Sequence, residues 1–433
     1  MFRAFANAFK IPDLRGKILF TLAIITVYRL GAYVPTPGVD YGVLRAITEG
    51  GDLTGPAQLI NLFSGGAFTQ LSVFALGIMP YITASIIMQL LTVVVPKVDE
   101  WKKEGESGQK KINQWTRYLT VVLALLQSTG LLVFIESGQL LGAGALPPGT
   151  SLIVDDGFAL RALMVLTMTA GVAFIMWLGE LITQRGVGNG MSLIIFSAIV
   201  SAMPAQGNAI LLNAGEIAFA ITIVVGLLLI VGVVFVELGQ RRIPVQYAKR
   251  QVGRRTYGGT STYIPLKVNQ SGVIPIIFAS SLLFIPSLLT GVIDTPGFSS
   301  FVDANLNPQD PRFVFIAVYF ALVMFFAFFY TSITFNPQDV ADNMKKYGGF
   351  IPGIRPGRPT AEYLDYVLTR ITTAGAIYLS VLAIIPLIVL AQAQLPFPFG
   401  GAMLLIVVGV GLNTLKQIES QLLQRNYEGF LRN

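Results

Sequence analysis

The sequence predicts an all-α polytopic membrane protein, with ten transmembrane helices in two pseudo-symmetric, inverted five-helix halves and with long cytoplasmic loops. Three observations support this fold class. The chain is 53% hydrophobic and 12% charged, whereas a soluble protein has about 25% charged residues. Ten apolar segments follow one another, and most approach the length of about 20 residues that a membrane-spanning helix needs. The basic residues gather in alternate connections between these segments.

The ten apolar segments are, in order, 18–34, 68–95, 118–135, 162–181, 191–203, 217–236, 273–290, 313–335, 371–391 and 402–415. An even number of spans places both termini on the same side. Of the 30 lysines and arginines, 26 lie in the termini and connections on that side, three lie on the other side, and Arg29 lies within the first span. Cytoplasmic segments carry such an excess, so we expect both termini to be cytoplasmic. The first span has a basic flank but no small-residue cleavage site, so we interpret it as a retained helix and expect Arg29 to snorkel outwards.

The stretch 61–96 is apolar enough for a bilayer but too interrupted for one plain helix. Gly65 and Gly66 break its start, and Pro80 lacks an amide donor and would kink or split a helix. We therefore predict a short half-helix near 61–74, a joint around 77–80 and a full helix over 81–95. Broken helices at membrane depth are tolerated where protein or a water-filled cavity surrounds them. The alternative is a proline-kinked core helix.

The two predicted halves, 1–215 with spans one to five and 216–433 with spans six to ten, share a pattern. The second and seventh spans contain prolines, and the fifth and tenth are short. Interrupted or short spans at matching positions of inverted halves are typical of a central pathway. These four spans offer mainly branched aliphatic side chains, which can close a pore by excluding water. Equally, aliphatic side chains are ordinary lipid-facing or core residues.

Several kinds of chemistry are excluded by composition. The chain has no cysteine and no histidine, so disulfides, thiolates, imidazole bases and nearly all zinc sites are absent. The acidic residues near spans (Glu136, Glu180, Glu216 and Glu237) stand at span ends rather than at mid-bilayer, where ion-coupled transporters keep charges. No phosphate-binding loop is present, and we interpret the glycines of 186–190 as a tight turn between the fourth and fifth spans. We therefore predict no catalytic residue, no metal and no cofactor.

Two cytoplasmic loops, 240–268 and 336–368, are longer than connections require. The first has two extended-looking runs around Gly258-Gly259, and its basic residues alternate with tyrosines. The second contains a rigid Ile-Arg-Pro-Gly turn at 354–357. Basic residues interleaved with aromatic ones suit structured RNA or an acidic protein surface. The alternative is the ordinary cytoplasmic excess of basic residues facing anionic lipids.

Motifs spread over nearly the whole chain resemble those of the SecY family, the channel subunit of the bacterial Sec protein translocase. They are LGIMPYITASIIMQLL (76–91), KKEGESGQKKINQWTRY (102–118), MWLGELITQRGVGNGMSLIIF (176–196), ELGQRRIPVQYAKRQVGRR (237–255), PLKVNQSGVIPIIFASS (265–281), FNPQDVADNMKKYGGFIPGIRPGRPT (335–360) and FGGAMLLIVVGV (399–410).

The resemblance implies a gated pore in the bacterial cytoplasmic (inner) membrane, which passes unfolded secretory polypeptides across and releases membrane-protein helices sideways. An aliphatic ring would consist of Ile82, Ile86, Ile195, Ile277 and Ile406, with Met191 at a neighbouring position where isoleucine is expected. The half-helix would be the plug that closes the pore, carrying Asn61, Leu62, Phe63, Ser64, Gly65, Gly66 and Phe68. Spans two and three would face spans seven and eight across a lateral gate, with Thr83 and Gln127 as polar residues at its seam.

The resemblance also implies partners. The SecA motor ATPase or the ribosome would dock on the cytoplasmic loops, through Arg241, Arg242, Lys249, Arg250, Arg254, Arg255 and Arg355. The small SecE and SecG subunits would brace the channel, with signal peptides, unfolded polypeptides and anionic lipids as further ligands. Two other functions remain as alternatives. A secondary transporter would need proton- or sodium-driven uptake by the chain alone, and a membrane-embedded enzyme would need activity without soluble partners.

Overall fold

The structure is a computed structural model that describes residues 9, 11–40, 42, 61, 64–136, 153, 157–247, 250–252, 255–257, 261–290, 296–306, 312–393 and 401–430. The chain divides into two compact units. The first comprises Met1–Asn208 together with Val410–Asn433, and the second comprises Ala209–Gly409.

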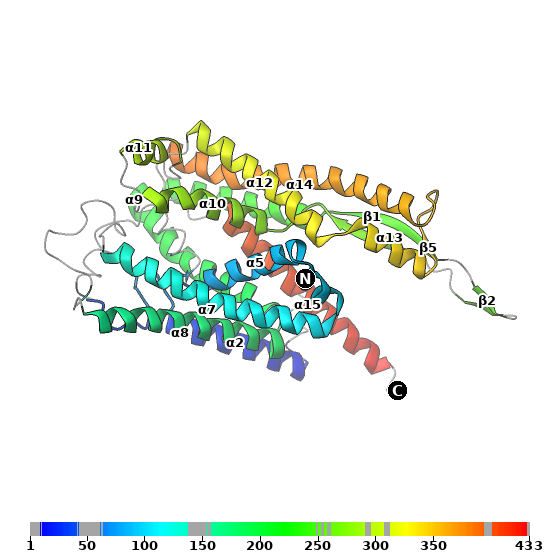
Figure 1. Ribbon diagram of the computed structural model, residues 1–433, viewed down its shortest axis with the longest axis horizontal. Helices are drawn as coiled ribbons and strands as arrows, with labels where there is room; N and C mark the ends of the chain where they lie inside the picture. Colours follow the sequence, from blue (N-terminus) through cyan, green and yellow to red (C-terminus); the bar gives the residue numbers. More distant parts are fainter. Residues whose placement is uncertain are drawn as a thin grey trace. The chain divides into compact units, whose positions relative to one another are not determined.

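Long helices form the first unit. They are α2 (Pro12–Gly31), α5 (Met79–Val94), α6 (Pro96–Lys103), α7 (Glu106–Glu136), α8 (Phe158–Arg185), the first part of α9 (Gly190–Leu238) and the last part of α15 (Gly401–Phe430). The α7 helix packs against both α5 and α8, and α2 lies against α8 (Figure 1). Bends at 186–188 separate α8 from α9, so the predicted tight turn is confirmed.

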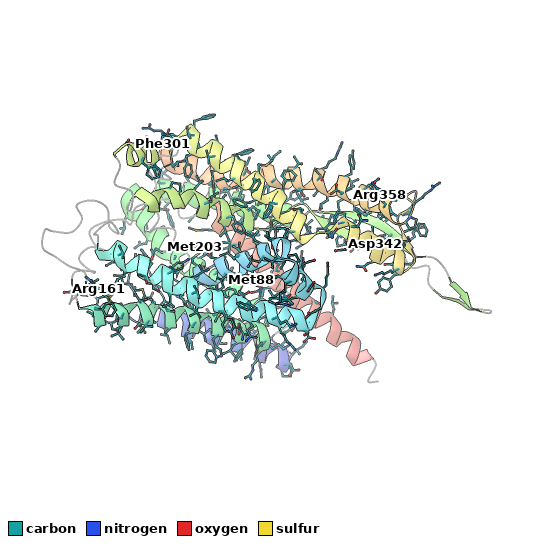
Figure 2. All side chains as sticks on the ribbon, viewed as in Figure 1. Met88, Arg161, Met203, Phe301, Asp342 and Arg358 are labelled. Carbon is teal, nitrogen blue, oxygen red and sulfur yellow. The ribbon has the colours of Figure 1, made fainter. Side chains whose placement is uncertain are left out.

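A sharp bend of 100° separates α5 from α6. Pro96 opens α6, where its missing amide costs no helical hydrogen bond. Met88 on α5 (labelled in Figure 2) belongs to a small apolar cluster with Val98 of α6 and Ile112 of α7. This cluster fixes the short α6 helix between α5 and α7.

The second unit combines helices with a small sheet. Its helices are the remainder of α9, then α10 (Ile274–Thr290), α11 (Pro296–Asn305), α12 (Phe313–Thr334), α13 (Pro337–Lys346), α14 (Arg358–Ala393) and the start of α15. The α12 helix packs between α10 and α14, and Figure 1 shows α12 and α14 side by side with α13 and β5 at one end. Pro275 lies in the first turn of α10 and Pro286 lies inside it.

Five strands are described in the second unit. They are β1 (Gln240–Tyr247), β2 (Arg250–Val252), β3 (Arg255–Tyr257), β4 (Ser261–Lys267) and β5 (Gly349–Phe350). Antiparallel β4, β1 and β5 form one sheet, and β2 and β3 form a separate hairpin. The two extended runs predicted around Gly258-Gly259 are thus confirmed as β1 and β4.

Each of the ten predicted apolar segments contains helical backbone, but residues 68–78 of the second segment form turns and its helix begins at Met79. Among the described residues, seven helices are long and apolar enough to cross a membrane, or eight if the bent α5–α6 pair is one span. The α9 helix contains the fifth and sixth segments, separated by a break at Gly215, where φ is 84°. The expectation of short fifth and tenth spans is wrong, because the candidate spans there are Gly190–Leu212, with 23 residues, and Met403–Leu423, with 21 residues.

Candidate functional site

The stretch from Gly65 to Ile78 is a succession of turns, so the half-helix predicted over 61–74 is wrong for its larger part. Asn61 and Ser64 have helical backbone, and the helix ends where glycines adopt the left-handed region, with φ of 66° at Gly65 and 89° at Gly66. Only glycine enters this region without steric cost. The rest of the segment is held by the chain that follows α2, since Val73 N donates to Val34 O at 2.9 Å. The predicted joint is confirmed, because α5 begins at Met79 with Pro80 in its first turn.

We call Asn61, Ser64, Gly65 and Gly66, the described residues at the end of the predicted plug, the plug base. Their own polar groups close the turn. Asn61 O accepts from Gly66 N at 2.9 Å, and Asn61 Oδ1 accepts from Thr69 N at 3.1 Å. Ser64 Oγ accepts from Phe68 N at 3.0 Å. Backbone groups that no helix or strand satisfies are therefore paired locally, as the membrane interior demands.

Two consecutive side chains of α2 bind the plug base. The Tyr28 hydroxyl donates to Ser64 O at 3.2 Å, and Arg29 Nη1 donates to Gly65 O at 2.8 Å. Tyr28 is fully buried, and its ring stacks on Phe74 with centroids 5.8 Å apart. The interpretation of Arg29 as a snorkelling residue did not include this partner. Sequence reasoning missed both residues, although an arginine within a span is itself a signal of a functional site.

The plug base also approaches α9 closely. A Cβ atom at Gly65 would lie 2.9 Å from Ala198 Cα and 2.7 Å from Arg29 Nη1, which leaves no room for a side chain. Gly66 differs, since a Cβ there would meet nothing within 4 Å. Glycine is thus required at position 65 both by φ and by contact.

The predicted ring residues are divided between the units. In the first unit, Ile86 is 7% exposed, and Ile82 and Ile195 both pack against one core cluster that also contains Met191 and Ala67. In the second unit, Ile406 is 5% exposed and Ile277 is partly buried. Ile82 and Ile195 are therefore brought to the same core, and the ring as a whole stays a prediction.

The predicted gate residues lie on neighbouring helices of the first unit. Thr83 is on α5 and Gln127 is on α7, and these helices pack together. Both side chains are partly buried, and Thr83 Oγ1 donates to Met79 O at 3.0 Å. The next residue, Ser128 of α7, meets Thr169 of α8 at 3.4 Å between hydroxyl oxygens. The gate stays a prediction.

In the second unit, the sheet carries exposed basic side chains beside an apolar core. Ile243 and Val245 on β1 and Leu266 on β4 are buried in an apolar core with α13 and α14, while Arg241 and Arg242 are exposed. The Arg242 guanidinium lies 4.8 Å from the centroid of the Tyr263 ring. Such stacking fixes a charged group on the surface without removing its hydrogen-bond donors from solvent.

The Arg355 turn is anchored on the same core. Ile351 is buried and Ile354 is partly buried in it, whereas Arg355 is exposed. Thr360 Oγ1 donates to Arg355 O at 2.8 Å, which ties the turn to the start of α14. Arg358 at that start and Asp342 on α13, both labelled in Figure 2, mark the same end of this unit. A rigid turn carrying an exposed arginine is thus present where the sequence predicts it.

Of the remaining predicted docking and plug residues, some lie within the described part of the chain and others lie outside it. Arg250 lies in β2 and Arg255 in β3, where Arg255 pairs with Val252. Leu62, Phe63, Lys249 and Arg254 lie outside the described residues. Among the residues that are described, no group of three or more His, Cys, Asp or Glu side chains is placed to hold a metal ion.

The model of the SecY family matches residues 72–415. The chain belongs to the SecY family. It is 58% identical to the protein translocase subunit SecY of Streptomyces scabiei and 55% identical to that of Mycobacterium tuberculosis strain H37Rv, in both cases over the whole of each chain. The resemblance stated from the motifs is confirmed.

Solved structures show the same fold at low identity. A structure described as a protein conducting channel has a TM-score of 0.62 at 16% identity, covering 95% of this chain and 96% of the other. A structure from a study of the plug domain of the SecY protein has a TM-score of 0.59 at 17% identity, covering 95% of this chain and 96% of the other. Sec61 from a canine ribosome–channel complex has a TM-score of 0.58 at 15% identity, with the same coverage of the two chains. The predicted polytopic helical fold of the SecY family is confirmed.

Proposed function

We propose that this chain is the central subunit of a protein-conducting channel, a passive gated pore that passes unfolded secretory polypeptides and releases membrane-protein helices into the bilayer. Membership of the SecY family and the likeness to solved channels support this function. The single observation that carries it is the plug base. This glycine-rich break of a span is packed against the same core cluster as Ile82 and Ile195.

The proposed pore closes with aliphatic side chains because its clients have no common sequence. Ile82, Ile86, Ile195, Ile277 and Ile406 offer no hydrogen bond, so they grip no particular polypeptide. Branched side chains can adapt to many shapes, and a dry constriction holds back ions and water. In the proposed arrangement the halves 1–215 and 216–433 part to admit a chain, and Thr83 and Gln127 lie along the lateral gate.

The energy for transport is supplied by partners in this proposal, since the chain is not an enzyme. A SecA-type motor ATPase or the ribosome docks on the exposed basic side chains of the sheet and on Arg355. SecE and SecG subunits and anionic lipids surround the spans. The excess of basic residues in alternate connections supports a position in the cytoplasmic membrane with both termini in the cytoplasm.

Reconstitution tests this function. Proteoliposomes containing the purified chain and its small subunits should protect an unfolded precursor from protease only when motor ATPase and ATP are added outside. Uptake of a small solute by the chain alone, driven by a proton or sodium gradient and without precursor protection, would contradict the channel and favour a secondary transporter.

The ring is tested by Ile406→Asn. Its amide would wet the apolar constriction, so resting ion conductance should rise and rejection of defective signal sequences should relax. Unchanged conductance in a correctly inserted variant would exclude Ile406 from the ring. Leu423, exposed on the same helix α15, provides the control as Leu423→Asn.

A further inference from the structure

Arg29 lies in the last turn of α2, but it does not serve the end of that helix. Three carbonyls there accept from backbone amides, because Ala32 N donates to Tyr28 O at 3.1 Å, Tyr33 N donates to Leu30 O at 3.1 Å and Val34 N donates to Gly31 O at 3.2 Å. The guanidinium instead reaches a carbonyl that lies 36 residues further along the chain, that of Gly65. A charged side chain within an apolar span is costly to insert into a bilayer, and the bond to the Gly65 carbonyl offsets part of that cost.

Gly65 is the point at which the helical backbone of the plug base ends and the turns begin. Its left-handed φ of 66° turns the chain, and Arg29 Nη1 satisfies its carbonyl. The preceding carbonyl, that of Ser64, accepts from the Tyr28 hydroxyl. Two adjacent α2 side chains therefore hold two adjacent carbonyls of the plug base. Displacing the plug base breaks both bonds, and one of them is charge-assisted.

We propose that Arg29 and Tyr28 are positioning residues that hold the plug base against α2 and so set the threshold for opening the channel. This inference rests on the proposed channel function. Arg29 contributes more than Tyr28 to the free energy that holds the plug base, because a hydrogen bond to a charged group is stronger than a neutral one. The Tyr28 hydroxyl contributes less to this free energy. Without the hydroxyl, the Tyr28 ring would still stack on Phe74 and keep that contact.

Resting ion conductance of the purified channel in planar bilayers tests the proposal. Arg29→Met keeps an unbranched side chain, although a shorter one, and removes every donor, and it should raise conductance in the absence of substrate about tenfold. Arg29→Lys keeps a charged donor and should stay close to the parent. Tyr28→Phe removes only the hydroxyl and should give a smaller rise, about twofold to fivefold.

Two control variants distinguish the loss of bonds to the plug base from a general effect of changing α2. Thr26→Val removes an exposed hydroxyl that bonds only to Leu22 O within the helix. Leu30→Ala shortens a side chain of α2 that is 66% exposed. Neither touches a carbonyl of the plug base, so both should leave resting conductance unchanged. A rise with either control as large as that of Arg29→Met would assign the effect to α2 packing and overturn the proposal.

A signal peptide distinguishes failure of this inference from failure of the proposed function. The parent channel should open when a signal peptide is added, and Arg29→Met should reach the same maximal conductance at lower peptide concentration. If the peptide opens both proteins at the same concentration and resting conductance is equal, the proposed role of Arg29 is wrong while the channel stands. If the peptide opens neither, the proposed function itself fails.

Discussion

The plug base and the sheet of β4, β1 and β5 are both insertions between long helices, but their backbones are held in different ways. The sheet has seven consecutive residue pairs between β1 and β4, from Gln240–Lys267 to Gln246–Ser261, so no single bond fixes it. The plug base depends on individual bonds from side chains such as Tyr28, Arg29 and Asn61. A region held by a ladder over an apolar core is a stable platform, whereas one held by a few separate bonds can be released by breaking them.

The largest effect should follow from a charge in the core under the sheet. Ile243 is 2% exposed and packs among apolar side chains of β4, α13 and α14. Ile243→Asp buries a carboxylate without a partner and should cost about 3–5 kcal/mol. The loops should lose their resistance to protease, and the midpoint temperature of thermal unfolding should fall strongly. The exposed neighbour Arg242→Asp is the matched control, and equal loss in both variants would contradict the description of the sheet as a packed platform.

A smaller effect should follow from filling the space at the plug base. Gly65→Ala adds a Cβ that meets Ala198 and Arg29 at a positive φ, so we expect it to destabilise the held position by about 1–3 kcal/mol. Gly66→Ala also has a positive φ, 89°, but its Cβ meets nothing. Resting conductance should therefore rise more for Gly65→Ala than for Gly66→Ala, in protein of equal yield. The same rise in both would mean that backbone strain alone, and no contact with α2 or α9, controls the plug base.

The smallest effect on stability should come from Arg355→Glu. The side chain is exposed, and Thr360 bonds to the backbone carbonyl of Arg355 rather than to its guanidinium. The free energy of unfolding should change by less than about 0.5 kcal/mol, while binding of the motor ATPase to the reconstituted channel should weaken. Loss of folded protein would show instead that Arg355 has a structural role in the platform.

The sequence predicted what periodicity and punctuation control. Helices occupy the apolar segments apart from residues 68–78 of the second one, the glycines of 186–190 form the turn before α9, and β1 and β4 occupy the extended runs. It failed where tertiary contacts decide the backbone. The residues after Ser64 look helical in composition, but Gly65 turns the chain against α2 and Ala198. The bond from Arg29 to Gly65 joins residues 36 apart and has no local signature. Whether the five isoleucines meet depends on both units together, which no local pattern encodes.

The measurement that tests the central claim most directly uses the absence of cysteine from the chain. A single cysteine replaces Ile82 or Ile406, and a secretory polypeptide with its own single cysteine is stalled during translocation. We predict a disulfide between polypeptide and channel at both positions and none at Leu228, a 67% exposed residue of α9. A competent stalled complex that forms no crosslink at Ile82 or Ile406, or forms one equally at Leu228, would contradict a central path through this protein.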